Sequence, residues 1–232
     1  MKIFVIDSYQ NMSKKAADEV FHITQALEVP LICPASGDST AGLYKEMLEK
    51  VKRNDMNISN WHFVGLDEWM GMNENDEGSC RYHLNLQLFN PLQIARDKIC
   101  FFNGRASEPE KECERVDDYI LQHGGIDVAI VGLGVNGHVG MNEPGTPGNM
   151  HSHVAEITEA TQKVGQKYFK SQQNLNQGLT LGMATLMEAR HIILLVSGKH
   201  KAAIAQKIIE EEVSEQLPAS LLRNHPSFKI FM

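Results

Sequence analysis

The stretch IDVAIVGLGVNGHVGMNEPG, residues 126–145, decides the fold, because an apolar run rich in β-branched residues passes directly into a glycine-rich loop. The apolar part is typical of a buried strand in an α/β protein. The loop carries His138 and Glu143, two side chains that can exchange protons. We therefore expect a functional loop at the carboxyl end of a strand.

The same loop spells G-x-G-x-x-G at residues 132–137, the sequence of a dinucleotide-binding turn. Such a turn needs a helix that begins among the glycines and holds the pyrophosphate at its N-terminus. Pro144 and Pro147 come too soon for that helix. Glu156 or Glu159, about twenty positions on, would supply the acidic residue of a nucleotide site, so this alternative stays open. We favour a catalytic loop.

Length and composition predict a single domain over residues 1–232. With 42% hydrophobic residues the chain can bury a full core, and no linker divides it. A net charge of −7 without a Lys/Arg cluster argues against a nucleic-acid partner. Residues 1–7 do not form a signal peptide, and no apolar run reaches membrane-spanning length. We expect a cytoplasmic protein with no membrane partner, and the sequence leaves open whether it forms a homo-oligomer.

The cysteines and histidines give no sign of a metal or a disulfide. The four cysteines form no C-x-x-C pair, and a chain of this size needs no covalent staples, so we expect free thiols. His151 and His153 resemble half of a metal site, but no third ligand follows at a suitable spacing. We interpret them as part of a surface loop and predict no metal.

Short β-rich runs alternate with amphipathic helical patterns along the chain, which predicts an α/β fold with a mostly parallel sheet covered by helices on both faces. Strands are expected at 2–6, 30–34, 61–66, 98–102, 128–132, 191–196 and 228–231. Helices are expected at 14–27, 40–53, 80–88, 108–123, 161–170, 180–188 and 201–211. Ligands of such sheets collect at the carboxyl ends of the strands, so those loops are the places to search.

One of these loops, ASGDST at residues 35–40, offers hydroxyls and backbone N–H groups just before a helix. This arrangement holds a phosphate. Helix capping alone would explain Ser39 or Thr40 but not the whole cluster. Lys201, at the start of a later helix, would add a point charge.

A second loop carries Asp67 and Glu68 after the strand expected at 61–66. Neighbours on an extended chain point to opposite sides, so at most one of them should face the cleft. A carboxylate there can move a proton on a carbon beside a carbonyl group, while a capping or solvated aspartate is the alternative. In the loop of residues 126–145, His138 can pass a proton to and from a sugar oxygen, with Glu143 orienting its ring. Together the loops indicate sugar-phosphate chemistry.

These residues resemble the glucosamine/galactosamine-6-phosphate isomerase (deaminase) family. Residues 66–69, LDEW, are similar to its L/M-D-E-Y/W motif, and residues 132–145 to its G-x-G-x-x-G-H-x-x-x-N-E-P-G motif. The similarity runs over nearly the whole chain. It implies a Rossmann-like fold of the sugar-phosphate isomerase type. It also implies an enzyme of amino-sugar catabolism that converts an amino-sugar 6-phosphate, a small-molecule partner, into a ketohexose 6-phosphate and ammonia, with no metal or organic cofactor.

The resemblance also implies roles for individual residues. Asp67 would be the base that moves the C2 proton toward C1. His138 would assist opening of the sugar ring, with Glu143 as its partner and Asn136 beside them. The substrate and its phosphate would be held by Ser36, Gly37, Asp38, Ser39, Thr40, Gly137 and Lys201.

Two departures from the family pattern bear on the substrate. By resemblance, glucosamine-directed members of the family carry an aspartate where this chain has Asn136. Galactosamine-directed members read G-x-N-G-H at the same place, as this chain does. The resemblance is therefore closest to the galactosamine branch, whose product is tagatose 6-phosphate, with glucosamine 6-phosphate and fructose 6-phosphate as the alternative. Lys167 is near the sequence position where the glucosamine enzymes carry an arginine that helps to hold the phosphate. A lysine supplies positive charge there but cannot form the two parallel hydrogen bonds of a guanidinium group.

Two further readings compete with the deaminase. A 6-phosphogluconolactonase-type hydrolase would share the S-G-x-S-T loop, but it would continue the Gly-His loop with an S-L-F-P-like stretch rather than with Asn142-Glu143-Pro144. A non-catalytic sugar-phosphate sensor would need an attached DNA-binding module, and we expect none before the first strand. The combination of Asp67, His138 and Glu143 favours the deaminase.

Overall fold

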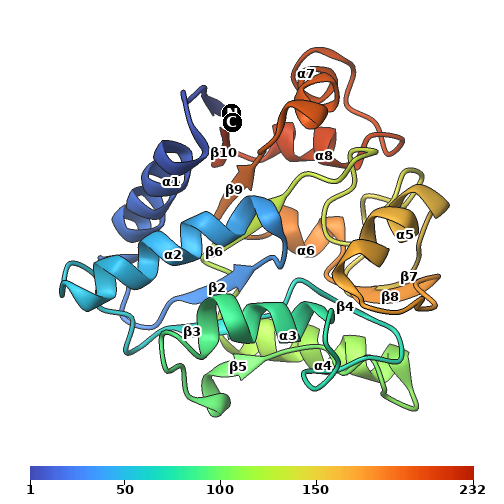
Figure 1. Ribbon diagram of the computed structural model, residues 1–232, viewed down its shortest axis with the longest axis horizontal. Coiled ribbons are helices and arrows are strands. Elements are labelled where there is room, and N and C mark those ends of the chain that lie inside the picture. The colour runs from blue at the N-terminus through green and yellow to red at the C-terminus, as the bar shows by residue number, and fades with distance from the viewer.

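A seven-stranded parallel sheet forms the centre of the computed structural model, which describes residues 1–232 (Figure 1). Its order is β1-β10-β9-β6-β2-β3-β5, and all neighbouring strands run parallel. The strands are β1 (Lys2–Phe4), β2 (Leu31–Pro34), β3 (His62–Val64), β5 (Ile99–Cys100), β6 (Val128–Gly132), β9 (His191–Leu195) and β10 (Phe228–Phe231). Each matches a strand expected from the sequence, so the predicted α/β class is confirmed.

Burial on both faces explains why the central strands are apolar without alternation. In β6, Val128 and Ile130 belong to one core, and Ala129 and Val131 belong to the other. All four are fully buried, because helices cover both faces of the sheet. A strand in this environment gains from an apolar side chain at every position.

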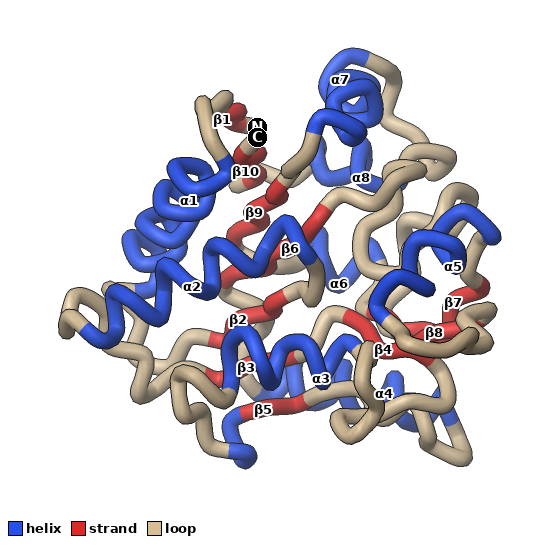
Figure 2. The backbone as a smooth tube through the Cα atoms, viewed as in Figure 1, coloured by secondary structure: helices blue, strands red, loops and turns tan.

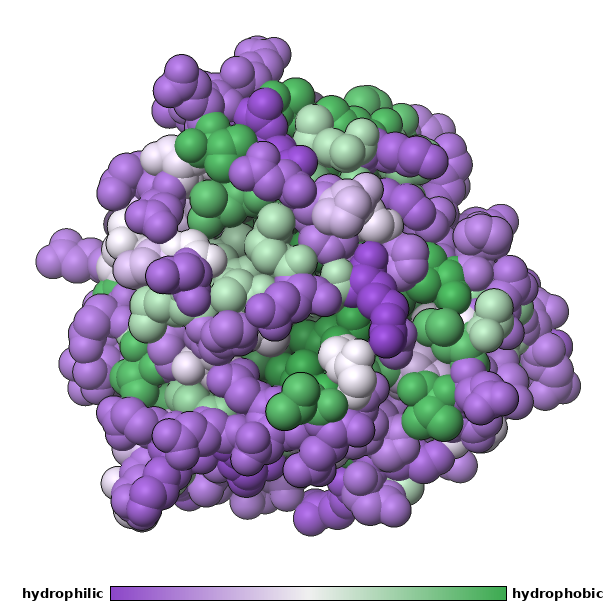
Figure 3. Space-filling model, turned by 180° about the vertical axis from the view of Figure 1, so that it is seen from behind, coloured by the Kyte–Doolittle hydropathy of each residue, from purple (hydrophilic) through white to green (hydrophobic).

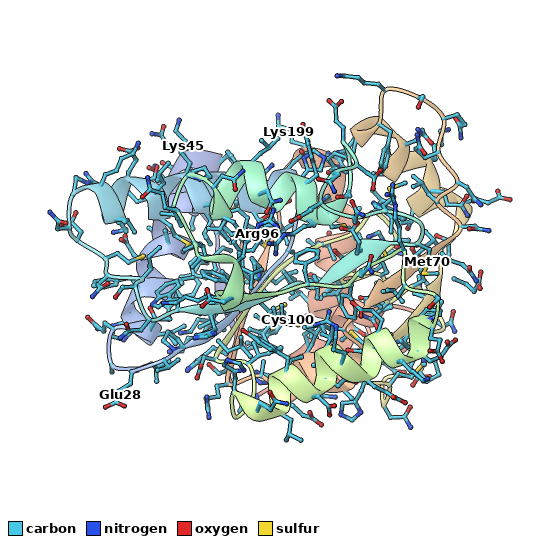
Figure 4. The ribbon with its side chains drawn as sticks, turned by 90° about the horizontal axis from the view of Figure 1, so that it is seen from below. Glu28, Lys45, Met70, Arg96, Cys100 and Lys199 are labelled. Atoms are coloured by element: carbon cyan, nitrogen blue, oxygen red, sulfur yellow. The ribbon has the colours of Figure 1, made fainter.

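The helices divide into two layers, one on each face. They are α1 (Tyr9–Thr24), α2 (Asp38–Lys52), α3 (Cys80–Leu84), α4 (Pro109–Gln122), α5 (Glu159–Gly165), α6 (Met183–Met187), α7 (Ala202–Glu210) and α8 (Pro218–Leu221). The first three, with the π-helical turn η1 (Asn85–Phe89), pack on one face, and α4, α6, α7 and α8 pack on the other. Figure 4 shows Cys100 in the layer between α2 and α3 above and α4 below, with Lys45 of α2 pointing to solvent.

A second, three-stranded antiparallel sheet was not expected from the sequence. It consists of β4 (Asp67–Trp69), β8 (Gln177–Thr180) and β7 (His153–Glu156), in the order β4-β8-β7. Figure 2 shows these strands side by side beyond the end of the large sheet. The region of His151 and His153, expected to be a surface loop, contributes an edge strand.

Helix boundaries also differ from the prediction. Helix α1 begins at Tyr9 rather than at residue 14, because Ser8 accepts a hydrogen bond from the N–H of Asn11 and caps it. The helix expected at 180–188 begins only at Met183, since Thr180 ends β8. The expected strand and helix types are otherwise confirmed.

The surface is mainly hydrophilic. Figure 3 shows apolar residues on the far face only in scattered patches between charged and polar ones. None of the helices combines the length and the apolar character that crossing a bilayer requires. All four cysteines are buried free thiols.

Candidate active site

A cavity of about 220 Å³ lies at the carboxyl ends of β2, β3, β6 and β9. The loops after these strands form its walls, and the turn that follows α5 covers one side. This is the place where parallel α/β sheets bind ligands. Of the predicted site residues, those that line it are Ser36, Gly37, Asp38, Ser39, Thr40, Asp67, His138 and Lys201.

Asp67 and Glu68 point to opposite sides of β4, as their adjacency predicts. Asp67 lines the cavity, where burial raises its pKa to about 6 against a hydrogen bond from the Cys80 thiol. Glu68 is fully buried, and its carboxylate accepts hydrogen bonds from the backbone N–H groups of Trp69, Cys80 and Arg81. Burial nevertheless raises the pKa of Glu68 to about 7. Asp67 is thus available as a base, whereas Glu68 joins β4 to α3.

His138 is held at Nδ1 by neutral partners. Its Nδ1 lies 2.7 Å from Asn136 Oδ1 and 3.1 Å from Thr161 Oγ1. The amide oxygen of Asn136 can only accept, because its Nδ2 donates to Glu143 Oε2 at 2.6 Å, so Nδ1 carries the proton. Nε2, without a hydrogen bond to the protein, is then the basic nitrogen of the ring.

Glu143 is buried behind the imidazole and is only partly satisfied. Its Oε2 accepts from Asn136 and, at 3.0 Å, from the hydroxyl of Thr158. Its Oε1 has no hydrogen-bond partner and lies 3.8 Å from His138 Nδ1. Burial lowers the pKa of His138, and Glu143 opposes that shift. The buried carboxylate therefore favours the imidazolium whenever His138 takes up a proton.

Two glycines of the loop after β6 have structural tasks. The imidazole of His138 lies against Gly134, where a Cβ would be 2.2 Å from Nε2. Gly137 has a φ of +86° and packs against Leu217, so it shapes the turn. Gly137 does not line the cavity, which differs from its predicted role in holding the substrate. No helix follows this loop before α5, in agreement with the argument against a dinucleotide site.

The other end of the cavity is rich in hydroxyl and ammonium groups. Ser39 Oγ lies 3.0 Å from Ser197 Oγ and 3.5 Å from Lys201 Nζ, beside the N-terminus of α2. The hydroxyl of Thr40 instead donates to Ala35 O, at 2.9 Å, and so orders the loop. Burial, and then the charge of Lys167, lowers the pKa of Lys201. These groups suit an anion such as phosphate.

Lys167 and Asp38 form an ion pair at the mouth of the cavity. Lys167 Nζ lies 2.6 Å from Asp38 Oδ2 and 4.7 Å from the centre of the Tyr168 ring. Asp38 was predicted to hold substrate, yet its carboxylate carries the same sign as a phosphate and already binds a lysine. Lys167 lines the same cavity as Ser39 and Lys201.

Several residues of the site escaped the sequence analysis, namely Cys80, Thr158, Thr161 and Tyr168. Thr158 had a detectable signal, since a threonine before Glu159 is a typical helix cap and the structure shows this cap. Its second contact, with Glu143, depends on tertiary structure. No group of three His, Cys, Asp or Glu side chains is placed to hold a metal ion.

A comparison with protein-family models places the chain among known proteins. The family model for glucosamine-6-phosphate isomerases and 6-phosphogluconolactonase matches residues 8–230. The chain belongs to this family. The predicted resemblance is thereby confirmed at the level of the family.

Several members of the family are similar over nearly their whole length. A glucosamine-6-phosphate deaminase of Shouchella clausii is 36% identical over 99% of this chain and 94% of its own. One of a Geobacillus species is 37% identical over 99% of this chain and 92% of its own. A solved structure described as a monomeric glucosamine-6-phosphate deaminase has a TM-score of 0.95 at 29% identity, covering 99% and 96% of the two chains.

The fold is also shared with lactonases of the family. The 6-phosphogluconolactonase of Thermotoga maritima superposes with a TM-score of 0.79 at 18% identity, covering 99% of this chain and 98% of its own. At this identity the likeness concerns the fold alone.

Proposed function

We propose that this member of the family converts a 2-amino-2-deoxyhexose 6-phosphate and water into a ketohexose 6-phosphate and ammonia. One observation carries the proposal. A carboxylate whose pKa burial raises to about 6, Asp67, shares a cavity with the basic nitrogen of His138 and with a cationic, hydroxyl-rich end. The similarity to deaminases over nearly the whole chain supports the same reaction.

The first step is opening of the sugar ring. His138 Nε2 takes the proton of the C1 hydroxyl and returns a proton to the ring oxygen, which leaves an aldehyde at C1. The imidazolium that forms in between is stabilised by Glu143, whose free Oε1 lies 3.8 Å from Nδ1.

Isomerisation and loss of ammonia follow. Asp67 removes the C2 proton while the carbonyl oxygen on C1 takes up a proton, which gives an enolamine. Asp67 then returns its proton to C1 and the amino nitrogen gives up one proton, which leaves a hydroxyl at C1 and an imine at C2. Water then adds to C2, and ammonia leaves with the nitrogen of the substrate. One water is consumed and one ammonia is released, so the atoms balance without a redox partner.

The substrate sugar stays a prediction with two candidates that differ at C4. The names of the relatives favour glucosamine 6-phosphate, with fructose 6-phosphate as product. Asn136 favours galactosamine 6-phosphate through the family pattern given above. Asn136 does not line the cavity and contacts His138 and Glu143, so any effect on the choice of sugar acts through the histidine. We therefore place glucosamine 6-phosphate first.

Ammonia release from each of the two sugars tests the proposal, with ketose 6-phosphate measured in parallel. We expect equal amounts of ammonia and ketose from at least one of them. Higher kcat/KM with the galacto sugar would reverse the order of the candidates. Absence of ammonia from both, together with hydrolysis of 6-phosphogluconolactone, would replace the deaminase by the lactonase.

A further inference from the structure

The cationic end of the cavity is built from two segments far apart in the sequence. Lys201 follows β9, and Lys167 lies in the short helix η3 (Gln166–Tyr168) after α5. Lys201 has no carboxylate within ion-pair distance, and Lys167 is close enough for its charge, after burial, to lower the pKa of Lys201. Two like charges at one end of a cavity call for an anion between or beside them.

In the structure that anion is Asp38, the first residue of α2. Its Oδ2 lies 2.6 Å from Lys167 Nζ, so the two side chains connect the start of α2 to the segment that covers the cavity. The backbone of Asp38 is fixed, because its carbonyl accepts from the hydroxyl of Tyr9. The carboxylate therefore projects from an anchored backbone position at the cavity mouth.

We propose that Asp38 is a built-in competitor of the substrate phosphate, which holds Lys167 in the ligand-free protein and lowers the affinity of the site for phosphate. The proposal rests on the proposed function for the presence of a phosphate group in this cavity. When phosphate enters, it takes Lys167 from Asp38, and the carboxylate then faces a dianion without its counterion. Both effects oppose binding.

This role predicts that removing the carboxylate strengthens binding. In Asp38→Asn we expect inorganic phosphate to bind about three- to tenfold more tightly, the effect of one like charge near a partly hydrated dianion. Titration calorimetry measures phosphate binding directly, and competitive inhibition of turnover measures it again. The difference from wild type should shrink in 0.5 M salt, which leaves a screening length of only a few ångströms.

The matched control is Glu77→Gln. Glu77, which precedes α3, pairs at 2.9 Å with Lys170, which follows η3, and neither side chain of this exposed ion pair lines the cavity. We expect its phosphate affinity to equal that of wild type. Asp38→Ala serves as a second variant, and thermal unfolding shows that both Asp38 variants are folded.

A double-mutant cycle with Lys167→Ala identifies the partner. Because Asp38 occupies Lys167 in wild type, Lys167→Ala should weaken phosphate binding more strongly in the Asp38→Asn background. The proposal would be overturned if Asp38→Asn bound phosphate no more tightly than wild type. It would also be overturned if neither wild type nor Asp38→Asn bound phosphate. Ammonia release decides separately whether the proposed reaction stands.

Discussion

The two ends of the cavity are built on different physical principles. Around His138 and Glu143 the side chains are buried and joined by short hydrogen bonds through neutral groups. Around Lys167 and Asp38 they are charged and open to water, with exposed side-chain fractions of 48% and 70%. The buried end can fix geometry and proton positions, whereas the open end can supply only attraction that salt weakens. Substitutions should therefore change kcat at the first end and KM at the second.

The largest effect is expected at the wall between the two ends. Asp67→Asn should lower kcat about 10²- to 10⁴-fold, because an amide cannot accept the C2 proton. Steady-state ammonia release measures the loss, and calorimetry with inorganic phosphate should show unchanged binding. A kcat within tenfold of wild type would remove Asp67 from the role of base.

At the open end, Lys201→Met should raise KM about ten- to a hundredfold and leave kcat nearly unchanged. A charge-assisted hydrogen bond to phosphate contributes about 1.5–3 kcal/mol, and each 1.4 kcal/mol is a factor of ten. Lys199, which points away from the molecule in Figure 4 and does not line the cavity, provides the control Lys199→Met. A fall in kcat alone would contradict the division between the two ends.

At the buried end, Thr158→Val should lower kcat about tenfold by removing the donor to Glu143 Oε2 and leaving that oxygen with one partner fewer. Thr158→Ser keeps the hydroxyl and should restore activity. Loss of the helix cap would lower stability in the valine variant as well, so the pH profile is the decisive measurement. If the pH profile of Thr158→Val were identical to that of wild type, the role of Thr158 would be limited to capping α5.

The smallest perturbation is a change of pH. Because burial raises the pKa of Asp67 to about 6, the ionised base is present above that pH and is lost below it. We expect kcat/KM to fall by about half near pH 6 and then about tenfold per pH unit. Burial lowers the pKa of His138 from its ordinary value, which favours the neutral imidazole. Activity that is constant down to pH 5 would show that Asp67 does not act as the base.

The same contrast explains what the sequence could reveal. The central strands β2, β6 and β9 of the large sheet are almost wholly apolar, and the loops after the strands carry recognisable motifs, so Asp67, His138, Glu143, Ser39 and Lys201 were predicted. That Asp67, His138, Ser39 and Lys201 line one cavity followed from the rule for parallel sheets, whereas Glu143 lies behind His138 and does not line it.

The small sheet and its contacts could not be predicted in this way. β4, β7 and β8 mix polar with apolar side chains and so lack the apolar run that marks the central strands of the large sheet. Residues 177–180 are a strand only because β4 and β7 lie on either side. The partnership of Thr158 with Glu143, and of Asp38 with Lys167, joins residues with no local pattern between them.

The pairing of β4 with β8 also bears on how the protein folds. Asp67 is opposite Thr180, more than 100 residues later in the chain, so the strand that carries the proposed base closes a long loop. Contacts of such high sequence separation form slowly. In refolding, the helical circular dichroism signal should therefore return before ammonia release does. During synthesis, the strand that carries Asp67 cannot pair with its neighbour until β8 has left the ribosome.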